Sequence, residues 1–373
     1  MNTMLSSPLR SWPTTRLTER LSIRYPIIQG PFGGGLSSPA LVAAVSNAGG
    51  LGSFGAHHLA PDEITRLVDQ LRGVTAQPFA VNLWVSTHDA PESTMTRDRF
   101  DTAVERLQPV YRAVGAAPPP FPERSWATFD EQVEAAIAAA PPVLSFVFGV
   151  PSRRVLDACR DRGIATIATA TTPDEGVALD EAGVDVIVAS GFEAGGHRGA
   201  FLAPAEDSLV GTMALTRVVV SEVGAPVVSA GGIADAHGIA AALSLGASGV
   251  QIGTAFLATE ESGTTPEHRA MLFSDAARRT LLTRAFSGRL ARGIPNRLTE
   301  DLATPDGHAP YPYQGYLLGP VLAAARRAGR TDVVSLWAGQ GAPLLRHRRA
   351  AELFDALVTG ADRLLGDPVP VAS

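Results

Sequence analysis

Residues 227–255 read VVSAGGIADAHGIAAALSLGASGVQIGTA, and this stretch decides the fold. A short β-branched run, Val227–Ala230, is followed by two glycines. Asp235–Leu245 then has helical character, and a second apolar run covers Gly249–Gly253. Both runs are apolar throughout rather than alternating, which is typical of parallel strands covered by helices. The stretch therefore predicts one strand–helix–strand unit of a parallel sheet.

The same alternation extends from this stretch back to residue 23. Apolar runs predict eight strands, at Ile23–Gln29, Leu51–Phe54, Phe79–Val85, Val143–Phe148, Ile164–Ala168, Val184–Ala189, Val227–Ala230 and Gly249–Gly253. Helical patterns lie between them, at Ala40–Ala48, Asp62–Leu71, Ser152–Arg162, Asp174–Glu181, Thr212–Val223 and Asp235–Leu245. Strand–helix units with right-handed crossovers close most naturally into a barrel when there are eight strands. We therefore predict an α/β fold, a (β/α)8 TIM barrel over residues 21–258.

Two segments do not fit this alternation. Residues 86–142 form a long insertion after the third strand, with helical patterns near residues 97–114 and 129–139. Residues 259–373 follow the eighth strand and contain several further helical patterns. Barrel enzymes build lids and substrate pockets from material at the C-terminal ends of their strands. We therefore predict a helical C-terminal cap over the barrel mouth, with C-terminal helices completing the barrel. An appendage packed on the outside of the barrel is the alternative.

The composition excludes several classes of function. The net charge is −6, and no basic stripe with interleaved aromatic residues is present, so nucleic acid is not an expected partner. All 31 positively charged residues are Arg, which excludes a Schiff-base or general-base lysine. Cys159 is the only cysteine, which excludes an internal disulfide and a CxxC motif.

The N-terminal residues carry no apolar segment of the kind found in secretory signals. No apolar run approaches the roughly 18 residues that a membrane-spanning helix requires. We expect residues 1–20 to form an unstructured tail and the protein to be soluble and cytoplasmic. The sequence does not decide the oligomeric state, and a homodimer is the assembly that we consider.

Glycines at the ends of the last two strands form the strongest chemical signal. Gly231 and Gly232 follow the seventh strand, and Gly253 and Thr254 follow the eighth. These strand ends are the usual phosphate site of a barrel, because a glycine backbone approaches closely and its N–H groups point at phosphate oxygens. The Thr254 hydroxyl would add one more donor. Loop sterics alone is the alternative, and a phosphate site does not distinguish FMN from a sugar phosphate.

Two other strand ends are suited to a planar ring. The first strand ends at Gln29 and Gly30, and the glycine-rich turn at residues 33–35 follows it. The third strand carries Asn82, whose carboxamide could bond the carbonyl and N–H groups of a ring. A simple turn and an Asn that caps a strand end are the alternative interpretation.

The loop after the sixth strand carries the best candidate for proton transfer. Residues 190–199 read SGFEAGGHRG, and this loop would project His197 over the barrel mouth. An imidazole that titrates near neutral pH suits either proton transfer or, when protonated, anion binding, and both roles stay open. The other seven histidines show no metal-ligand spacing, so no metal site is predicted. They are His57, His58, His88, His237, His268, His308 and His347.

Many of these runs resemble motifs of the nitronate monooxygenase family, formerly called 2-nitropropane dioxygenases. The runs are YPIIQGP (25–31), AVSNAGGLG (44–52), FEAGGHRG (192–199), AGGIA (230–234), LGASGVQIGT (245–254), TRAFSGR (283–289), Tyr311-Pro312 and WAGQ (337–340). The resemblance covers about residues 20–345, and EAGGHRG is highly specific to this family and its close relatives. Phe32 and Gly319 stand where members often carry Met and Lys, and these departures concern the substrate rather than the flavin fold.

The resemblance implies a TIM barrel that binds FMN and oxidises alkyl nitronates with O2 to a carbonyl compound and nitrite. It places the cofactor on Gln29, Gly30, Asn82, Gly195, Gly196, Ala230, Gly231, Gly232, Gln251, Gly253 and Thr254. It makes His197 the catalytic histidine, and His197 and Tyr311 the substrate contacts. An NAD(P)H-dependent flavin reductase acting on quinones or enoyl thioesters shares these motifs and is the main alternative. A barrel that binds a phosphorylated ligand without redox chemistry is a third reading.

Overall fold

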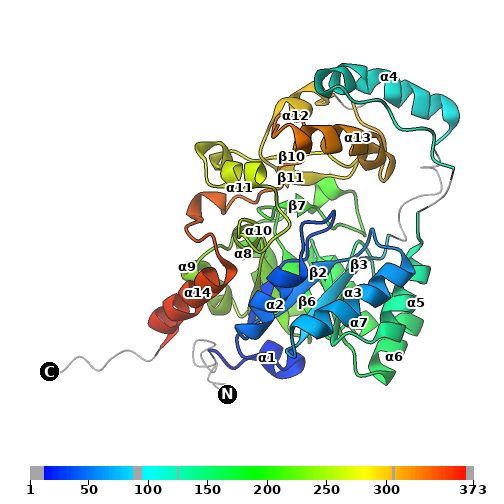
Figure 1. Cartoon of the computed structure of the whole chain (residues 1–373). Coiled ribbons are helices and arrows are strands. Elements are labelled where there is room, and N and C mark those ends of the chain that lie inside the picture. Colours follow the sequence, from blue (N-terminus) through cyan, green and yellow to red (C-terminus); the bar gives the residue numbers. More distant parts are fainter. Residues whose placement is uncertain (1–11, 87–94, 124–125, 305–306, 367–373) are drawn as a thin grey trace.

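A closed sheet of parallel strands forms the centre of the protein (Figure 1). The computed structural model describes residues 12–86, 95–123, 126–304 and 307–366. Within these ranges the large sheet has eight strands, in the order β1-β9-β8-β6-β5-β4-β3-β2. They are β1 (Ile27–Gln29), β2 (Gly52–Gly55), β3 (Phe79–Trp84), β4 (Val143–Val147), β5 (Ala165–Ala170), β6 (Val186–Ser190), β8 (Val227–Ala230) and β9 (Gly249–Ile252). A parallel bridge between Ile28 and Leu51 joins the two edges, so the predicted (β/α)8 barrel is confirmed.

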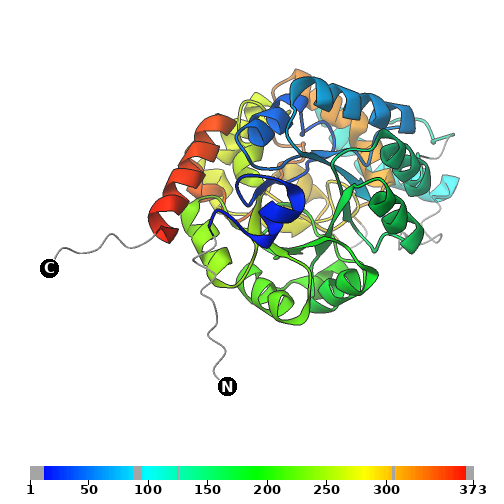
Figure 2. The ribbon, with the colours of Figure 1, turned by 90° about the horizontal axis from the view of Figure 1, so that it is seen from below.

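The strands are apolar throughout because each face is buried against a different layer. Ala80 of β3 packs inside the barrel with Ile167 and Val228, whereas Val81 and Leu83 face the surrounding helices. This alternation follows from the period of two residues along a strand. The helices that ring the barrel are α2 (Pro39–Asn47), α3 (Pro61–Val74), α5 (Phe129–Ala139), α6 (Arg153–Asp161), α7 (Pro173–Ala182), α8 (Thr212–Glu222), α9 (Ala236–Ser244) and α14 (Ala350–Leu365) (Figure 2).

All eight predicted strands and the six predicted barrel helices are present, and most of their ends shift by only one or two residues. The largest difference is at the first strand, which begins at Ile27 rather than Ile23. Arg24 and Tyr25 both donate their backbone N–H to Gly49 O, so this stretch forms a turn. Pro26 then has no N–H to donate, which delays the start of the strand ladder.

The N-terminal prediction was wrong in part. Helix α1 (Arg16–Leu21) covers the bottom of the barrel, at the N-terminal ends of the strands (Figure 2). Its residues Leu17 and Leu21 belong to the same buried cluster as the barrel interior. The Thr15 side chain caps the helix by accepting a hydrogen bond from Thr18 N. The bond satisfies one of the backbone N–H groups of the first turn that have no partner within the helix. The unstructured tail expected over residues 1–20 therefore does not include this helix, and residues 1–11 lie outside the described ranges.

A cap covers the opposite end of the barrel, at the C-terminal ends of the strands (Figure 1). It contains α4 (Arg97–Val114), α11 (Pro266–Leu272), α12 (Arg297–Asp301) and α13 (Tyr313–Arg327). It is not purely helical, because β10 (Leu281–Thr283), β11 (Ala291–Gly293) and β7 (Gly196–His197) form a small antiparallel sheet within it. The insertion after β3 divides between the two regions: α4 packs on α13 in the cap, whereas α5 packs on α3 in the barrel wall. Helix α14 packs on α9 and α2 and fills the last place in the ring.

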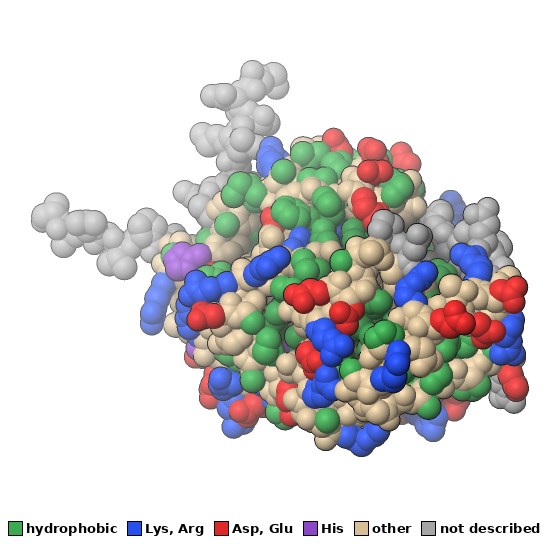
Figure 3. All heavy atoms as spheres, turned by 90° about the horizontal axis from the view of Figure 1, so that it is seen from above, with side chains coloured by type: hydrophobic (Ala, Val, Ile, Leu, Met, Phe, Trp, Pro, Cys, Tyr) green, Lys and Arg blue, Asp and Glu red, His purple; other side chains and the backbone are tan. Residues whose placement is uncertain are grey.

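The face seen from above carries charged side chains of both signs, intermixed with apolar and uncharged groups (Figure 3). No region of this view is dominated by one sign of charge. Within the described ranges, no helix combines the length and the apolar character needed to cross a bilayer.

Candidate active site at the barrel mouth

Two consecutive glycines after β8 form the first part of the site. Gly231 and Gly232 have φ values of 116° and 71°, a region that residues with a Cβ seldom occupy. A Cβ on Gly231 would lie 2.5 Å from Thr212 Oγ1, so only glycine fits here. Among the described residues, neither glycine donates its backbone N–H to a protein acceptor. Two unused donors therefore lie side by side at the end of the strand.

Two further segments complete this cradle. Gly253 precedes the short helix α10 (Thr254–Leu257), and Thr254 Oγ1 accepts a hydrogen bond of 2.9 Å from Gly339 N. That bond uses a lone pair and leaves the hydroxyl hydrogen of Thr254 for another acceptor. Residues 337–341, which we name the closing segment, lie against the glycine pair, because a Cβ on Gly341 would overlap Gly232 O.

Other residues predicted from the sequence meet at the same place. Ala230 and Gln251 are directly paired in the register of β8 and β9, and Gln251 is half-buried. Gly195 packs so tightly on the closing segment that a Cβ would lie 2.5 Å from Gly339 N, and Gly196 has a φ of 79°. The structure therefore gathers the predicted phosphate and ribityl residues into one region of the mouth.

Groups of β3 and β4 and of the turn after β1 form a polar layer at the mouth. Asn82 Nδ2 donates to Ser145 Oγ at 2.9 Å, and both residues are two positions beyond inward-facing apolar residues of β3 and β4. Gly30 donates its N–H to Ile252 O at 2.9 Å, and a Cβ there would lie 3.2 Å from Gly253 Cα. Asn82 and Gly30 therefore border the mouth, as the sequence predicts.

Gln29 is placed differently from its neighbours. It is fully buried, and its side chain accepts a 2.9 Å hydrogen bond from Ser53 N and donates to Gly30 O. Ile28 points into the barrel, so the alternation of the strand turns the next side chain toward the wall between β1 and β2. Its amide thus fixes the turn that carries Gly30.

His197 lies on β7, opposite Ala291 of β11. Its Nε2 is 2.7 Å from Ser287 Oγ. Three aromatic rings surround the imidazole: Trp84 at 4.9 Å, Trp337 at 5.1 Å and Phe148 at 6.4 Å between centroids. Burial lowers the pKa of His197 to about 3, and the nearby Arg289 guanidinium lowers it in the same direction. His197 is therefore uncharged at neutral pH.

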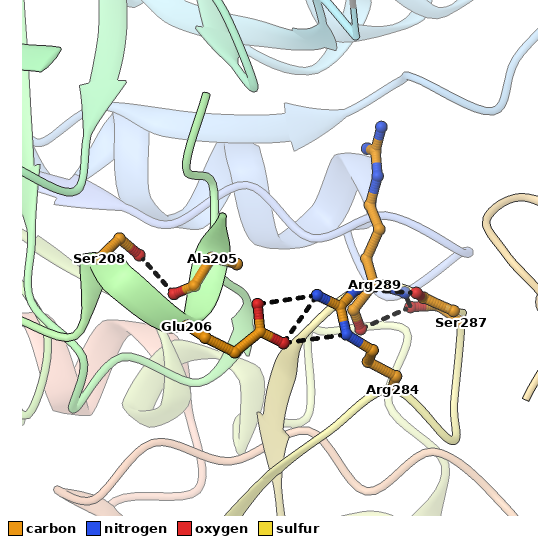
Figure 4. A network of polar contacts seen from close by, with 7 residues as sticks. Ala205, Glu206, Ser208, Arg284, Ser287 and Arg289 are labelled. Carbon is orange, nitrogen blue, oxygen red and sulfur yellow. Dashed lines mark hydrogen bonds and ion pairs between the residues drawn. The ribbon is translucent and has the colours of Figure 1, made fainter. Parts of the chain in front are cut away.

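The loop that carries Ser287 is tied to the loop after β7. Arg284 donates from Nε and Nη2 to the Glu206 carboxylate, at 2.8–3.1 Å, and from Nη1 to Gly288 O at 3.2 Å (Figure 4). A bidentate pair of this kind fixes direction as well as distance. The side chain of Arg289 points away from this pair in the same view. The Arg284–Glu206 pair therefore supports the loop that holds the partner of His197.

Arg289 forms the centre of an aromatic cluster beside His197. Its guanidinium carbon is 4.0 Å from the ring centroids of Phe148 and Tyr311 and 5.0 Å from that of Trp84. Its Nη2 donates to Ser86 Oγ at 3.2 Å. Phe148 and Ser86 have φ values of 64° and 52°, and such backbone strain outside glycine concentrates at functional sites. Tyr311, a predicted substrate contact, thus lies in the cluster next to His197.

Sequence reasoning assigned no role to several residues of this site. Trp84 lies two residues beyond Asn82 on the same face of β3, and this spacing was enough to predict that both side chains face the mouth. Ser287 and Arg289 lie within the quoted TRAFSGR run, and Trp337 within WAGQ, yet neither run shows which ring it will meet. Their contacts join segments from β3, β4, β7 and the cap, and only the fold brings those together.

Comparison with known proteins identifies the family. The sequence model described as nitronate monooxygenase matches residues 14–360. This chain belongs to the nitronate monooxygenase family. It is 42% identical over 351 residues to the nitronate monooxygenase of Pseudomonas aeruginosa, covering 92% of this chain and 98% of that one.

Solved structures agree with this assignment. The nitroalkane oxidase of Streptomyces ansochromogenes superposes with a TM-score of 0.84 at 36% identity, covering 94% of this chain and 99% of that one. FabK of Thermotoga maritima is more distant, with a TM-score of 0.71 and 27% identity over 94% and 96% of the two chains. The resemblance found in the motifs is confirmed, and the chain is an oxidoreductase of a flavin-dependent family. The flavin reductase alternative is not favoured.

Proposed function

We propose that this enzyme binds FMN at the barrel mouth and oxidises alkyl nitronates with O2, giving a carbonyl compound and nitrite. The observation that carries the proposal is that unused backbone donors and a neutral histidine meet at one mouth, in a chain of this family. The glycine pair offers the donors for an anion, and His197 lies among aromatic rings at the same mouth.

The cradle fits the phosphate of FMN. The amides of Gly231 and Gly232 and the hydroxyl hydrogen of Thr254 would hold its oxygens, since none of these donors is used within the described protein. Gly253 leaves room for the phosphate to approach the backbone, and a Cβ there would meet only Phe32, at 3.9 Å. Ala230 and Gln251 would border the ribityl chain from the floor of the mouth.

The polar layer suits the edge of a flavin ring. Gly30, Asn82, Gly195 and Gly196 would line it, and Gln29 would act indirectly by fixing the turn at Gly30. FMN, when bound, supplies the electron-transfer chemistry, and the protein supplies orientation and electrostatics.

His197 would act in its neutral form. A histidine with a pKa of about 3 carries no charge at neutral pH, so it cannot hold an anion by charge. Its Nε2 is used by Ser287, which leaves Nδ1 for the substrate. We therefore assign His197 to a hydrogen bond to the nitronate through Nδ1, while Tyr311 and Trp84 shape the adjoining wall.

The proposal is tested by turnover of the FMN-loaded protein. We expect an alkyl nitronate to give nitrite with consumption of O2, and NADH or NADPH with a quinone to give no turnover. The variant His197→Asn should lose about 10- to 100-fold in kcat/KM while retaining FMN, because a hydrogen bond to a charged group contributes roughly 1.5–3 kcal/mol. Absence of nitrite from the wild-type protein, or rapid oxidation of NADPH, would contradict the proposal.

A further inference from the structure

His57 was set aside as a metal ligand, yet the structure places it at the mouth. We propose that His57 is a further binding residue of this site, whose Nδ1 donates a hydrogen bond to an oxygen of the molecule bound there. That oxygen belongs either to a carbonyl of the flavin ring or to the nitronate. The inference rests on the proposed function, because it names a contact within that same site.

The ring of His57 belongs to the aromatic cluster beside His197. It stacks on Trp84 with centroids 3.7 Å apart and planes 8° from parallel. Trp84 in turn lies 4.9 Å from the ring of His197. Burial lowers the pKa of His57 most, and the nearby Arg289 guanidinium lowers the pKa of both His57 and His197. His57 is therefore separated from the catalytic histidine only by the indole of Trp84.

The Nδ1 atom of His57 carries the proposal. It is buried, and no described residue forms a hydrogen bond with it. A buried polar atom without a partner costs about 1–3 kcal/mol, so such an atom in a folded protein calls for a ligand or another explanation. His268 offers a contrast, since its Nε2 is bonded to Trp337 O at 3.0 Å.

Three elements hold the His57 ring where it is. Gln132 of α5 donates from Nε2 to His57 O at 2.9 Å and to Leu59 O at 2.8 Å, which fixes the turn after β2. The edge of the ring rests on Gly33, where a Cβ would overlap His57 Cε1. Trp84 covers one face. The buried Nδ1 without a partner is thus part of a built position rather than of a mobile side chain.

The chemistry of the ligands sets the direction of the bond. Burial lowers the pKa of His57 well below its usual value, so the ring is neutral and carries one N–H. A nitronate presents only oxygen acceptors, and the carbonyl groups of a flavin are acceptors as well. The tautomer with hydrogen on Nδ1 therefore satisfies the buried atom and the ligand together.

The test compares two replacements of His57 with a matched control. His57→Phe keeps an aromatic ring on Trp84 but has no donor, whereas His57→Asn places an amide N–H close to the position of Nδ1. The control is His58→Phe, because His58 is exposed and Phe keeps an aromatic ring edge-on to His57, at the 5.3 Å centroid distance of the wild type. FMN affinity is measured by quenching of flavin fluorescence, and kcat and KM for a nitronate are measured separately.

We expect His57→Phe to weaken one affinity by about tenfold, the size of one lost hydrogen bond to a buried group. A weaker FMN affinity identifies the flavin carbonyl as the partner, and a higher nitronate KM at unchanged kcat identifies the substrate oxygen. His57→Asn should recover most of the loss, and His58→Phe should match the wild type.

Two results would overturn the inference. One is a His57→Phe protein with wild-type FMN affinity and wild-type nitronate KM. The other is an equal loss in His57→Phe and His57→Asn, which would show that the shape of the imidazole rather than its donor matters. FMN affinity is measured without turnover, so this part of the test is independent of whether the wild-type protein forms nitrite, which decides the proposed function.

Discussion

His197 differs from an ordinary surface histidine because aromatic rings replace water around it. Trp84 and Trp337 lie within 5.1 Å of its ring, and Ser287 is 2.7 Å from Nε2. Water solvates the charged form poorly there, and the pKa falls from an ordinary value near 6.5 to about 3. At the scale of single residues, the site thus depends on a histidine that is kept neutral and is held by one hydroxyl.

Replacing that hydroxyl gives the prediction at this scale. Ser287→Ala should lower kcat/KM for a nitronate by about five- to tenfold, because one hydrogen bond contributes roughly 1 kcal/mol, and should leave FMN affinity unchanged. In the wild type, His197 should give no inflection in kcat/KM between about pH 5 and 8, since it gains a proton only as the pH falls toward its pKa of about 3. Initial rates across this range check both points.

Ser46→Ala is the matched control. Ser46 Oγ is also buried and donates to Pro78 O at 2.8 Å, but it lies in α2, outside the site. It should lower stability without changing kcat/KM. A rate that follows an ionisation near 6.5, or a Ser287→Ala protein as active as the wild type, would show that this description of His197 is wrong.

The sequence could indicate His197 but not its surroundings. Glycines on both sides and a position after the sixth strand were enough to predict its place at the mouth. Ser287 is 90 residues away along the chain, and Trp84 is in a different strand, so no local pattern connects them to it. Gln29 shows the opposite difficulty: its residue type suited a ring, but its place in the strand alternation turns it to the wall.

At the scale of elements, the closing segment connects the glycine cradle to His197. Gly339 N donates to Thr254 Oγ1 and Gln340 N donates to Glu193 O, both at 2.9 Å. The Trp337 ring, at the other end of the segment, contacts His197. One short stretch therefore touches the glycine cradle, the loop after β6 and the His197 ring.

Adding a methyl group to this segment should weaken cofactor binding. A Cβ on Gly341 would overlap Gly232 O, and a backbone atom cannot move aside as a flexible side chain can. We expect Gly341→Ala to reduce FMN affinity by about tenfold or more, in line with the typical cost of overpacking. Titration of the apoprotein with FMN, followed by flavin fluorescence, measures this.

Gly315→Ala is the control for glycine replacement. Gly315 lies in α13 of the cap, and nothing lies within 4 Å of its added Cβ. The change should leave FMN affinity intact and stabilise the helix by about 0.5–1 kcal/mol. If Gly341→Ala binds FMN as tightly as Gly315→Ala, the closing segment does not shape the cradle.

Elements differ in how well the sequence predicts them. The barrel strands are predictable because each is a continuous apolar run that local composition reveals, as in Val227–Ala230. The small sheet in the cap was not predicted. Its strands have only two or three residues, β11 contains Arg292, and its pairing with β7 joins residues far apart in the chain. Such pairing depends on the cap being folded over the barrel.

At the scale of the whole molecule, buried neutral histidines couple stability to pH. Burial lowers the pKa of His57, His197 and His268 in the folded protein, and for His268 the value falls to about 4. The unfolded chain binds protons near pH 6.5, where these folded residues do not. Above about pH 6.5 these histidines are neutral in both states and do not change the free energy of unfolding. As the pH falls below that value, the unfolded chain takes up protons that the folded protein does not, and the free energy of unfolding decreases.

His268 allows this coupling to be measured away from the reacting groups. Between pH 7 and pH 5 the unfolded chain protonates His268, whereas the folded protein keeps it neutral. This difference alone should lower the free energy of unfolding of the apoprotein by about 2 kcal/mol. His268→Gln stays uncharged and retains a donor for Trp337 O, so its melting temperature should fall less between pH 7 and pH 5 than that of the wild type. Thermal unfolding of both apoproteins at the two pH values tests this, and equal shifts would contradict it.

If the site works as proposed, a nitronate and not a nicotinamide reduces the flavin bound at this mouth. The most direct test is the visible spectrum of the FMN-loaded protein under anaerobic conditions, recorded before and after addition of an alkyl nitronate, with NADH and NADPH added to parallel samples. We predict loss of the oxidised flavin absorbance with the nitronate and none with either nicotinamide. Rapid bleaching by a nicotinamide and no change with the nitronate would contradict the account and assign the site to a reductase.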